Sequence, residues 1–177
     1  MTVRFSLDTS ALSRAMEGID GSIKDAVRPA AQAAAQVIYD AAKSNVGKIR
    51  AKTGNLASSI YQAYKDKTST DARAMYDVSW NPKKAPHAGL VEYGHIQRYQ
   101  SYVGKDGQWH TMVRPEMRGK KKPGRRASMA VKDAYYVLRK GGPVQVAAQP
   151  FMRPAKSAFP AAREAAAKKI LEAIRGN

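Results

Sequence analysis

The sequence predicts an α+β fold: a long N-terminal amphipathic helix and a C-terminal helix packed on a small antiparallel sheet, with a basic hairpin and loop inserted. Two observations predict the helices, because apolar residues recur at helical spacing over 22–46 and again over 154–174. A third predicts the sheet, because 60–65 and 75–80 read as strands on either side of a polar turn. The chain of 177 residues fits a single domain, 1–177, within which 96–146 is the insertion.

The composition indicates a thin core and a strongly positive field. Alanine supplies much of the 44% hydrophobic content, and with only three Phe and two Trp we expect packing through small residues. Association with further copies of the chain would add to such a core. The 31 Lys and Arg exceed the 14 Asp and Glu, and the net charge of +17 attracts nucleic acid or an acidic protein surface.

The chain contains no cysteine, which excludes disulfides and thiolate metal sites and is compatible with a reducing compartment. Its first residues lack the apolar stretch of a secretory signal, and no later segment approaches the ~20 apolar residues that a membrane span needs. We therefore expect a soluble protein with no membrane partner.

The N-terminal part predicts one strand and two helices. Alternating apolar residues at 3–7 are typical of a short strand with one buried face. A helix with Leu12, Met16 and Ile19 on its apolar face should follow and end at Asp20-Gly21. The Ala-rich helix over 22–46 comes next, and Pro29 should kink it or restart it.

A short helix and a hairpin are predicted next. Thr53 is a good N-cap for a helix that carries Leu56 and Ile60 inward, with Gly54 as the flexible turn residue beside it. The strands at 60–65 and 75–80 should then pair as a hairpin, which the prolines after Trp80 end.

A helix over 88–93 should stop at Gly94 in a left-handed C-cap. We expect Leu90 and Val91 to be buried beside Tyr93. Glu92 is the one acid in its neighbourhood, and we expect it to pair with Arg98 or Arg153.

The inserted stretch predicts a second hairpin within 96–113, turning at 105–107, with Tyr99, Tyr102 and Val103 facing Trp109, Met112 and Val113. The aromatic side chains could stack on nucleic-acid bases, although packing across a sheet is the commoner role of such residues. A turn at 141–143 should precede a strand at 144–146.

A basic run follows that hairpin, at 114–126, with seven Lys and Arg and one acid, a net charge of +6. It has almost no apolar anchor, so we expect a mobile loop in the free protein. Two interpretations stay open: a solvated loop that serves solubility, or an arm that contacts phosphates. The cations are Arg114, Arg118, Lys120, Lys121, Lys122, Arg125 and Arg126.

The stretch Pro150-Phe151-Met152-Arg153-Pro154 should be extended, because each proline restricts the residue before it, with Phe151 as the apolar anchor. The helix over 154–174 then closes the fold and could bend at Pro160.

No residues form a convincing catalytic or cofactor site. The three histidines lie in loop-like contexts, no serine stands in a nucleophile elbow, and no phosphate-binding glycine loop occurs. Glu92 and His95 have the spacing of two metal ligands, but Gly94 between them favours a capped turn. We therefore expect no enzyme activity, metal or cofactor.

Three blocks in a fixed order carry a resemblance to a known family. They follow an Ala-rich helix, and the matching residues are Thr53, Gly54, Leu56, Ser59 and Ile60, then Val91, Glu92, Tyr93 and Gly94, then Pro150, Phe151, Pro154 and Ala155. This pattern resembles the tail-component or tail-completion family of tailed-phage minor tail proteins, and is similar to the Z-type protein of lambdoid phages. The likeness covers about 20–95 and 147–175 of this chain.

The chain departs from the family pattern at His87-Ala88-Gly89, where Tyr-Ala is frequent, and at His95, where threonine is common. The resemblance implies a structural virion protein of the tail or neck, assembled in the host bacterial cytoplasm and without enzymatic activity. It also implies a ring, hexameric or dodecameric, in contact with head-completion, connector or tail-terminator proteins. Genomic DNA would pass through the lumen of that ring.

A rival interpretation from another class stays open. The same charge could drive a free-standing nucleic-acid-binding protein, such as a packaging or condensing factor. Such a protein would bind tightly as a monomer or dimer, whereas a tail part would bind weakly alone.

Overall fold

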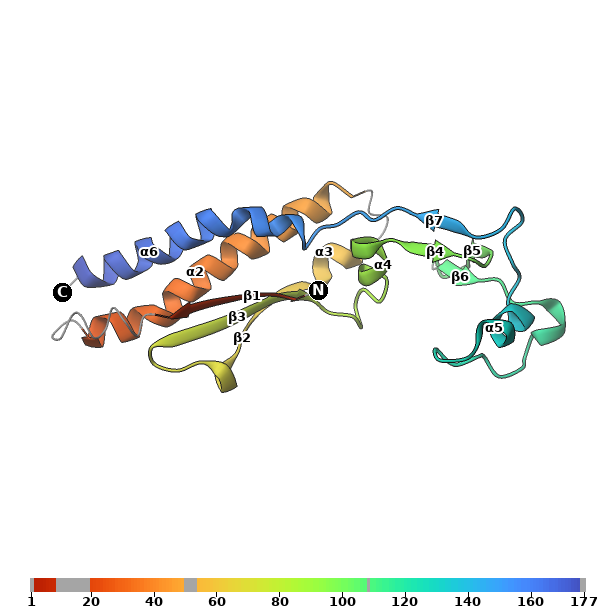
Figure 1. The fold of residues 1–177 in the computed structure, drawn as a ribbon, viewed down its shortest axis with the longest axis horizontal. Coiled ribbons are helices and arrows are strands. Elements are labelled where there is room, and N and C mark those ends of the chain that lie inside the picture. The colour runs from red at the N-terminus through yellow and green to blue at the C-terminus, as the bar shows by residue number, and fades with distance from the viewer. Residues whose placement is uncertain (1, 9–19, 50–53, 108, 176–177) are drawn as a thin grey trace. The chain divides into compact units, whose positions relative to one another are not determined.

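Two long helices and a three-stranded sheet are the largest elements of the structure (Figure 1). The computed structural model describes residues 2–8, 20–49, 54–107 and 109–175. Its contacts divide the chain into unit 1, residues 1–93 and 149–177, and unit 2, residues 94–148. The predicted α+β class is confirmed. The predicted insertion at 96–146 falls inside unit 2.

The sheet of unit 1 has the strand order β1-β3-β2 and is antiparallel throughout. Strands β2 (Ile60–Tyr64) and β3 (Arg73–Trp80) form the predicted hairpin around a short 3-10 helix, Asp66–Thr68. The N-terminal strand β1 (Val3–Asp8) joins the other side of β3. The two strands predicted on either side of the polar turn are therefore confirmed.

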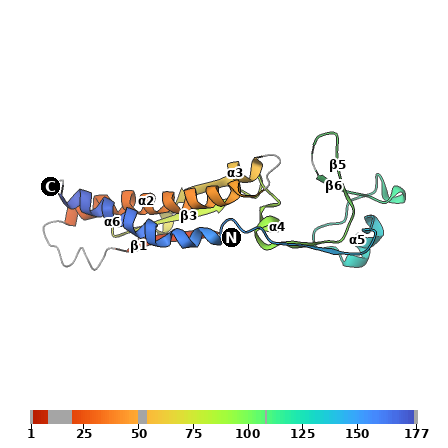
Figure 2. The same ribbon diagram turned by 90° about the horizontal axis from the view of Figure 1, so that it is seen from above.

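Helix α2 (Asp20–Gly47) contacts all three strands and the C-terminal helix α6 (Phe159–Arg175) (Figures 1 and 2). It begins at Asp20, so the prediction that Asp20-Gly21 ends an earlier helix is wrong. That earlier helix, through Leu12, Met16 and Ile19, lies outside the described residues. Pro29 neither interrupts nor restarts α2, since the helix continues through it with the proline exposed and the opposite face buried.

The core of unit 1 is packed through alanine, as predicted. Five alanines described in α2 are fully buried, at 30, 31, 34, 35 and 42, and on α6 Ala162 and Ala166 are buried. Small side chains allow two helix backbones to approach closely, which explains why the long α2–α6 contact needs few large residues.

Helix α6 begins later than predicted and is not bent at its proline. A 3-10 helix at Pro154–Ala158 leads directly into α6, which places Pro160 in the first α-helical turn. A proline is tolerated there because the first N–H groups of a helix have no partner within it. Ala162 and Ala166 lie on the buried face of α6, and the partly buried Ile170 packs against the same core.

Unit 2 consists of two short ribbons and one helix. Strand β4 (His95–Gln97) pairs with β7 (Val144–Val146), and β5 (Ser101–Val103) pairs with β6 (Trp109–Thr111). Helix α5 (Met129–Tyr135) follows the basic run, which contains only a 3-10 helix at Pro115–Met117. The turns predicted at 105–107 and 141–143 are confirmed, with left-handed glycines at 107, 141 and 142.

The partners in the second hairpin differ in part from the prediction. Val103 lies opposite Trp109 as expected, but Tyr102 lies opposite His110. Tyr99 and Val113 do not face that hairpin, because they bridge to Leu138 and Tyr136. The stretch 136–138 therefore acts as a third strand, a pairing that local alternation could not reveal.

Burial is very unequal between the two units. Among the described residues of unit 2, Tyr136 is the single buried hydrophobic side chain, whereas unit 1 holds the whole extended core. Unit 1 therefore contains the apolar burial that a stable fold requires, and unit 2 is stabilised mainly by hydrogen bonds and small contacts.

Replacing residues 95–147 by a short Gly-Ser linker should leave unit 1 folded. A Cβ placed on Gly94 would lie 2.9 Å from the Ala148 backbone nitrogen, so a short linker can join these positions at little entropic cost. The shortened chain should keep a helical circular dichroism spectrum and one cooperative thermal transition. Loss of that transition would show that unit 1 does not fold without unit 2.

Candidate functional site

A buried glutamate organises the point at which the chain leaves unit 1 and returns to it. Glu92 is on helix α4 (Ala88–Tyr93), is 0% exposed, and accepts three backbone hydrogen bonds from the residues 149–153, which we call the return segment. Its Oε2 accepts from the N–H groups of Phe151 at 2.8 Å and Met152 at 2.9 Å, and its Oε1 accepts from Arg153 at 3.0 Å.

The predicted pairing of Glu92 is resolved in favour of Arg153. The Arg153 Nε donates to Glu92 Oε1 at 3.1 Å, and its Nη2 donates to the Glu92 carbonyl. The guanidinium also lies 5.2 Å from the centre of the Tyr93 ring. Arg98, the other candidate, instead binds Asp133 through two hydrogen bonds.

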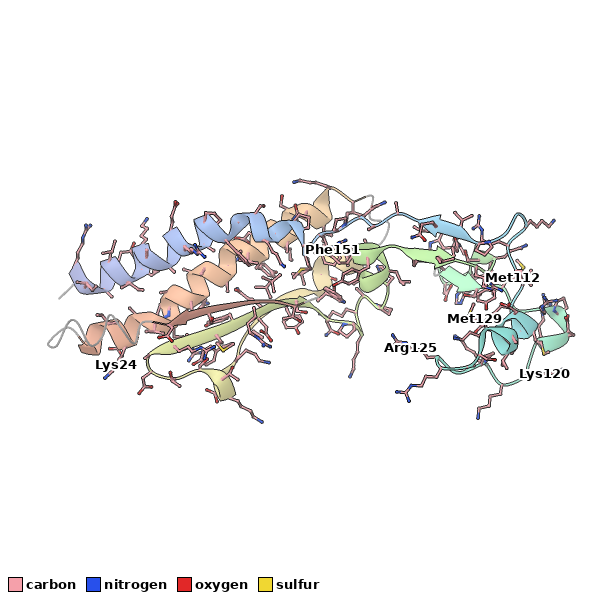
Figure 3. The ribbon with its side chains drawn as sticks, viewed as in Figure 1. Lys24, Met112, Lys120, Arg125, Met129 and Phe151 are labelled. Atoms are coloured by element: carbon pink, nitrogen blue, oxygen red, sulfur yellow. The ribbon has the colours of Figure 1, made fainter. Side chains whose placement is uncertain are left out.

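Further contacts hold the return segment from its other side. Asn45, near the end of α2, donates its Nδ2–H to the Phe151 carbonyl at 3.1 Å, and the Gln149 N–H donates to the Val91 carbonyl at 2.8 Å. The Phe151 side chain is fully buried and meets Trp80 edge-on, with ring centres 5.7 Å apart. The predicted anchor role of Phe151 is thus confirmed, and Figure 3 shows it beside α4.

The charge of Glu92 is stabilised despite its burial. Desolvation would raise the pKa of this carboxyl, but the N–H donors of Met152, Phe151 and Arg153 and the Arg153 guanidinium favour the charged form. The pKa of Glu92 is therefore lowered from its ordinary value of 4.5. An ionised, fully bonded carboxylate is a structural part and holds no lone pair in reserve for catalysis.

The buried face of α4 differs from the prediction. Leu90 is 47% exposed and Val91 is half-buried, whereas Ala88 and Glu92 are fully buried. The prediction assumed that apolar residues face inward, but three N–H groups of the return segment need an acceptor, and only a carboxylate on the inner side of α4 supplies it.

Gly94 ends α4 in the left-handed conformation, with φ at 71°, as predicted. A Cβ at this position would lie 2.7 Å from the Val146 carbonyl oxygen. Glycine is therefore needed at position 94 for two reasons: the positive φ angle, and the close approach of the segment that contains Val146.

The first motif block contributes core residues. Leu56 and Ile60 are buried at 5% and 4% exposure, as predicted, and belong to the same cluster as Phe151 and Ala155. The N-cap position of α3 (Asn55–Ser59) is Gly54, in a left-handed conformation and without a side-chain cap, so the N-cap assignment to Thr53 is wrong. Thr53 itself lies outside the described residues.

The basic run divides into engaged and free cations. Arg114 is half-buried and its Nε donates to the carbonyls of Asp133 and Tyr136 at 3.1 and 3.2 Å, so it supports the fold of unit 2. Arg118 lines an open hollow of about 600 Å³ with Tyr102, Met112 and Tyr135. The other cations are exposed and, among the described residues, form no ion pair: Lys120, Lys121, Lys122, Arg125 and Arg126.

The aromatic side chains near this run pack mainly on one another. Tyr99 lies 5.1 Å from Tyr136 and donates its hydroxyl to Asp133, and Tyr102 lies 5.6 Å from His110. Trp109 is 62% exposed. Tyr99 therefore packs within the unit, whereas Tyr102 is 48% exposed.

The sequence did not reveal three residues that bond the backbone of the return segment or of the basic run. Asn45 continues the helical spacing of Ile38 and Ala42, and a polar residue in that position could have been noticed. Tyr135 and Lys132, which bond the backbone of the basic run, left no local signal. Within the described ranges, no group of three metal-ligating side chains gathers, and no helix has the length and apolarity to cross a membrane.

Comparison with known proteins gives one match. Residues 10–94, just under half of the chain, match the model of a family described as "Bacteriophage HK97-gp10, putative tail-component". Neither the curated proteins nor the solved structures give a match. The family match supports a structural protein of tailed phages, of the tail or head–tail group, and ends at Gly94, where unit 2 begins.

Substituting Glu92→Gln should lower the free energy of unfolding by about 2–4 kcal/mol, because it removes the charge and turns an amide donor toward buried N–H groups. Chemical denaturation would measure this. Glu172→Gln is the control, since Glu172 forms an exposed pair with Lys169 and its loss should leave stability unchanged. Equal stabilities of the Glu92 variant and the wild type would contradict the structural role.

Acid should remove the contribution of Glu92. Because its folded pKa lies below the unfolded value of 4.5, the stabilisation is present above that pH and is lost as the pH falls through the folded pKa. The difference in unfolding free energy between wild type and Glu92→Gln should therefore narrow from about pH 4.5 downward, since shifts of other carboxylates cancel in the comparison. If this difference in unfolding free energy stays constant down to about pH 3, the charged form of Glu92 is not what stabilises the fold.

Proposed function

We propose that the chain is a structural protein of a tailed bacteriophage that completes the tail or joins it to the head, working as a ring of identical copies. The observation that carries the proposal is the family match over 10–94. The matched stretch supplies α2, the hairpin and α4, and the return segment locks onto the end of it through Glu92. The finer likeness to the Z-type protein of lambdoid phages rests on the three motif blocks.

A ring is supported by surface that a single copy leaves uncovered. Unit 2 has eight large hydrophobic side chains that are at least 40% exposed: Ile96, Tyr102, Val103, Trp109, Met129, Val131, Leu138 and Val144. The described residues of unit 2 bury one hydrophobic side chain and expose eight, so the exposed apolar surface of this unit is large for a monomer. A contact that joins different surfaces of successive copies generates a ring when the rotation closes.

The ion pair between the buried Glu92 and the partly exposed Arg153 suits a scaffold. The Glu92 carboxylate accepts from backbone N–H groups and from Arg153, whose guanidinium also donates to the Glu92 carbonyl, and the neighbouring Phe151 closes the core. Such a site fixes chain geometry and leaves no group to act on a substrate. A part that must keep one shape within a large assembly gains from this rigidity, which favours a structural role over the enzymatic one.

The rival, a free-standing nucleic-acid-binding protein, draws on the net charge of +17 alone. It accounts for neither the family match nor the exposed apolar surface. The two functions differ in where the protein is found: in finished particles, or free in the cell and bound to nucleic acid.

A phage lacking this protein should accumulate heads and tails that are not joined, or tails that are not completed. Electron microscopy of lysates would show this, and supply of the wild-type protein or of Glu172→Gln should restore whole particles. Imaging of those particles should place the chain at the neck or tail end with rotational symmetry. Normal infectious particles without the chain would refute the tail role.

A further inference from the structure

We propose that residues 120–126, the basic arm, bind the phosphate backbone of duplex nucleic acid without regard to sequence. Arg114, at the start of the basic run, is not part of this surface, because backbone carbonyls already engage it. The inference goes beyond the proposed function and does not depend on it, since it concerns one surface of unit 2 and not a place in a particle.

The charges of unit 2 are distributed so that the arm is not neutralised. The unit has twelve Lys and Arg against three acids. Each acid is already engaged: Asp133 by Arg98, Glu116 by Arg114, and Asp106 by His110. Five cations of the arm thus have no counter-charge among the described residues, and the unit bears a formal net charge of +9. A polyanion would release its own counterions on meeting them.

Two hydrogen bonds fasten the arm to helix α5. The Tyr135 hydroxyl donates to the Lys120 carbonyl at 3.0 Å, and the Lys132 ammonium donates to the Arg125 carbonyl at 2.9 Å. Figure 3 labels Lys120 and Arg125 in the arm and Met129 on α5. These bonds use carbonyls of the arm and leave its side-chain cations for a ligand, and a held backbone lowers the entropy lost on binding.

The length of the arm suits several phosphates. Residues 120–126 span at most about 20 Å, and that length of duplex carries roughly twelve phosphate charges on its two strands. All five free cations can therefore find phosphates on one piece of duplex.

The composition of the arm favours nucleic acid over an acidic protein. Its one apolar residue is Pro123, whereas protein interfaces depend on buried apolar or aromatic anchors. Duplex is favoured over single strands because single-strand binding needs aromatic faces along the binding surface, and the arm itself contains no aromatic residue.

The test compares two variants of the full chain with equal net charge. In the arm variant, five cations become Gln: Lys120, Lys121, Lys122, Arg125 and Arg126. In the control variant, five exposed cations of unit 1 become Gln: Lys67, Lys83, Lys84, Lys156 and Arg163. Binding to a random-sequence duplex is measured between about 50 and 200 mM salt, and thermal unfolding checks that both variants are folded.

The wild type should bind with an affinity that falls steeply with salt. In the arm variant, the slope of log affinity against log salt should fall by about 4 to 5, at about 0.9 for each lost phosphate contact. The control variant should change that slope by less than about 1. A single strand of the same sequence should bind the wild type more weakly than the duplex.

Three results would overturn the proposal. Equal losses in the two variants would mean that net charge alone attracts DNA, and an unchanged slope in the arm variant would mean that the arm makes no phosphate contacts. Tighter binding of the single strand would contradict the duplex assignment. Particle assembly is measured separately with the arm variant. Normal particles together with lost DNA binding would be compatible with the tail role. A chain that is absent from particles but binds DNA through the arm would contradict the tail role and still support the binding site.

Discussion

The Glu92 carboxylate, bonded to three successive backbone N–H groups, is the interaction on which the rest of unit 1 depends. Residues 151–153 of the return segment stand between Pro150 and Pro154, so they do not continue a helix, and their N–H groups require an acceptor in the interior. By supplying one, Glu92 seats Phe151 in the core and fixes the start of the final helical stretch. The cost of burying the charge is offset by four donors, which is why the pKa is lowered and not raised.

The two units differ in apolar burial and in their coverage by the family match. Unit 1 contains nearly all the buried apolar side chains and the stretch that matches the tail-component family, whereas unit 2 begins where that match ends. A scaffold with its own core can carry an insertion whose surface is free to differ, because the core does not depend on it. Among the described residues, the basic arm and most of the exposed large hydrophobic side chains are found in unit 2.

Positive charge has two roles that the structure separates. Arg98, Arg114 and Arg153 are engaged with carboxylates and carbonyls and help to define the fold. The cations of the basic arm have no such partner among the described residues, and they supply a field that acts on ligands outside the molecule. Net charge alone does not distinguish these roles, since both kinds of residue count equally toward +17.

The sequence by itself determined helices α2, α3, α4 and α6, the β2–β3 hairpin, the turn at Gly94 and the anchor at Phe151, because periodicity and turn chemistry are local properties that a few neighbouring residues fix. It also limited the partner of Glu92 to two arginines. Only the tertiary structure decided that Arg153 is the partner, that Glu92 and not Leu90 faces inward, and that Tyr99 pairs with 138. The physical reason is the same in each case: these contacts join residues tens of positions apart, and local spacing carries no information on which distant N–H group or strand will need a partner.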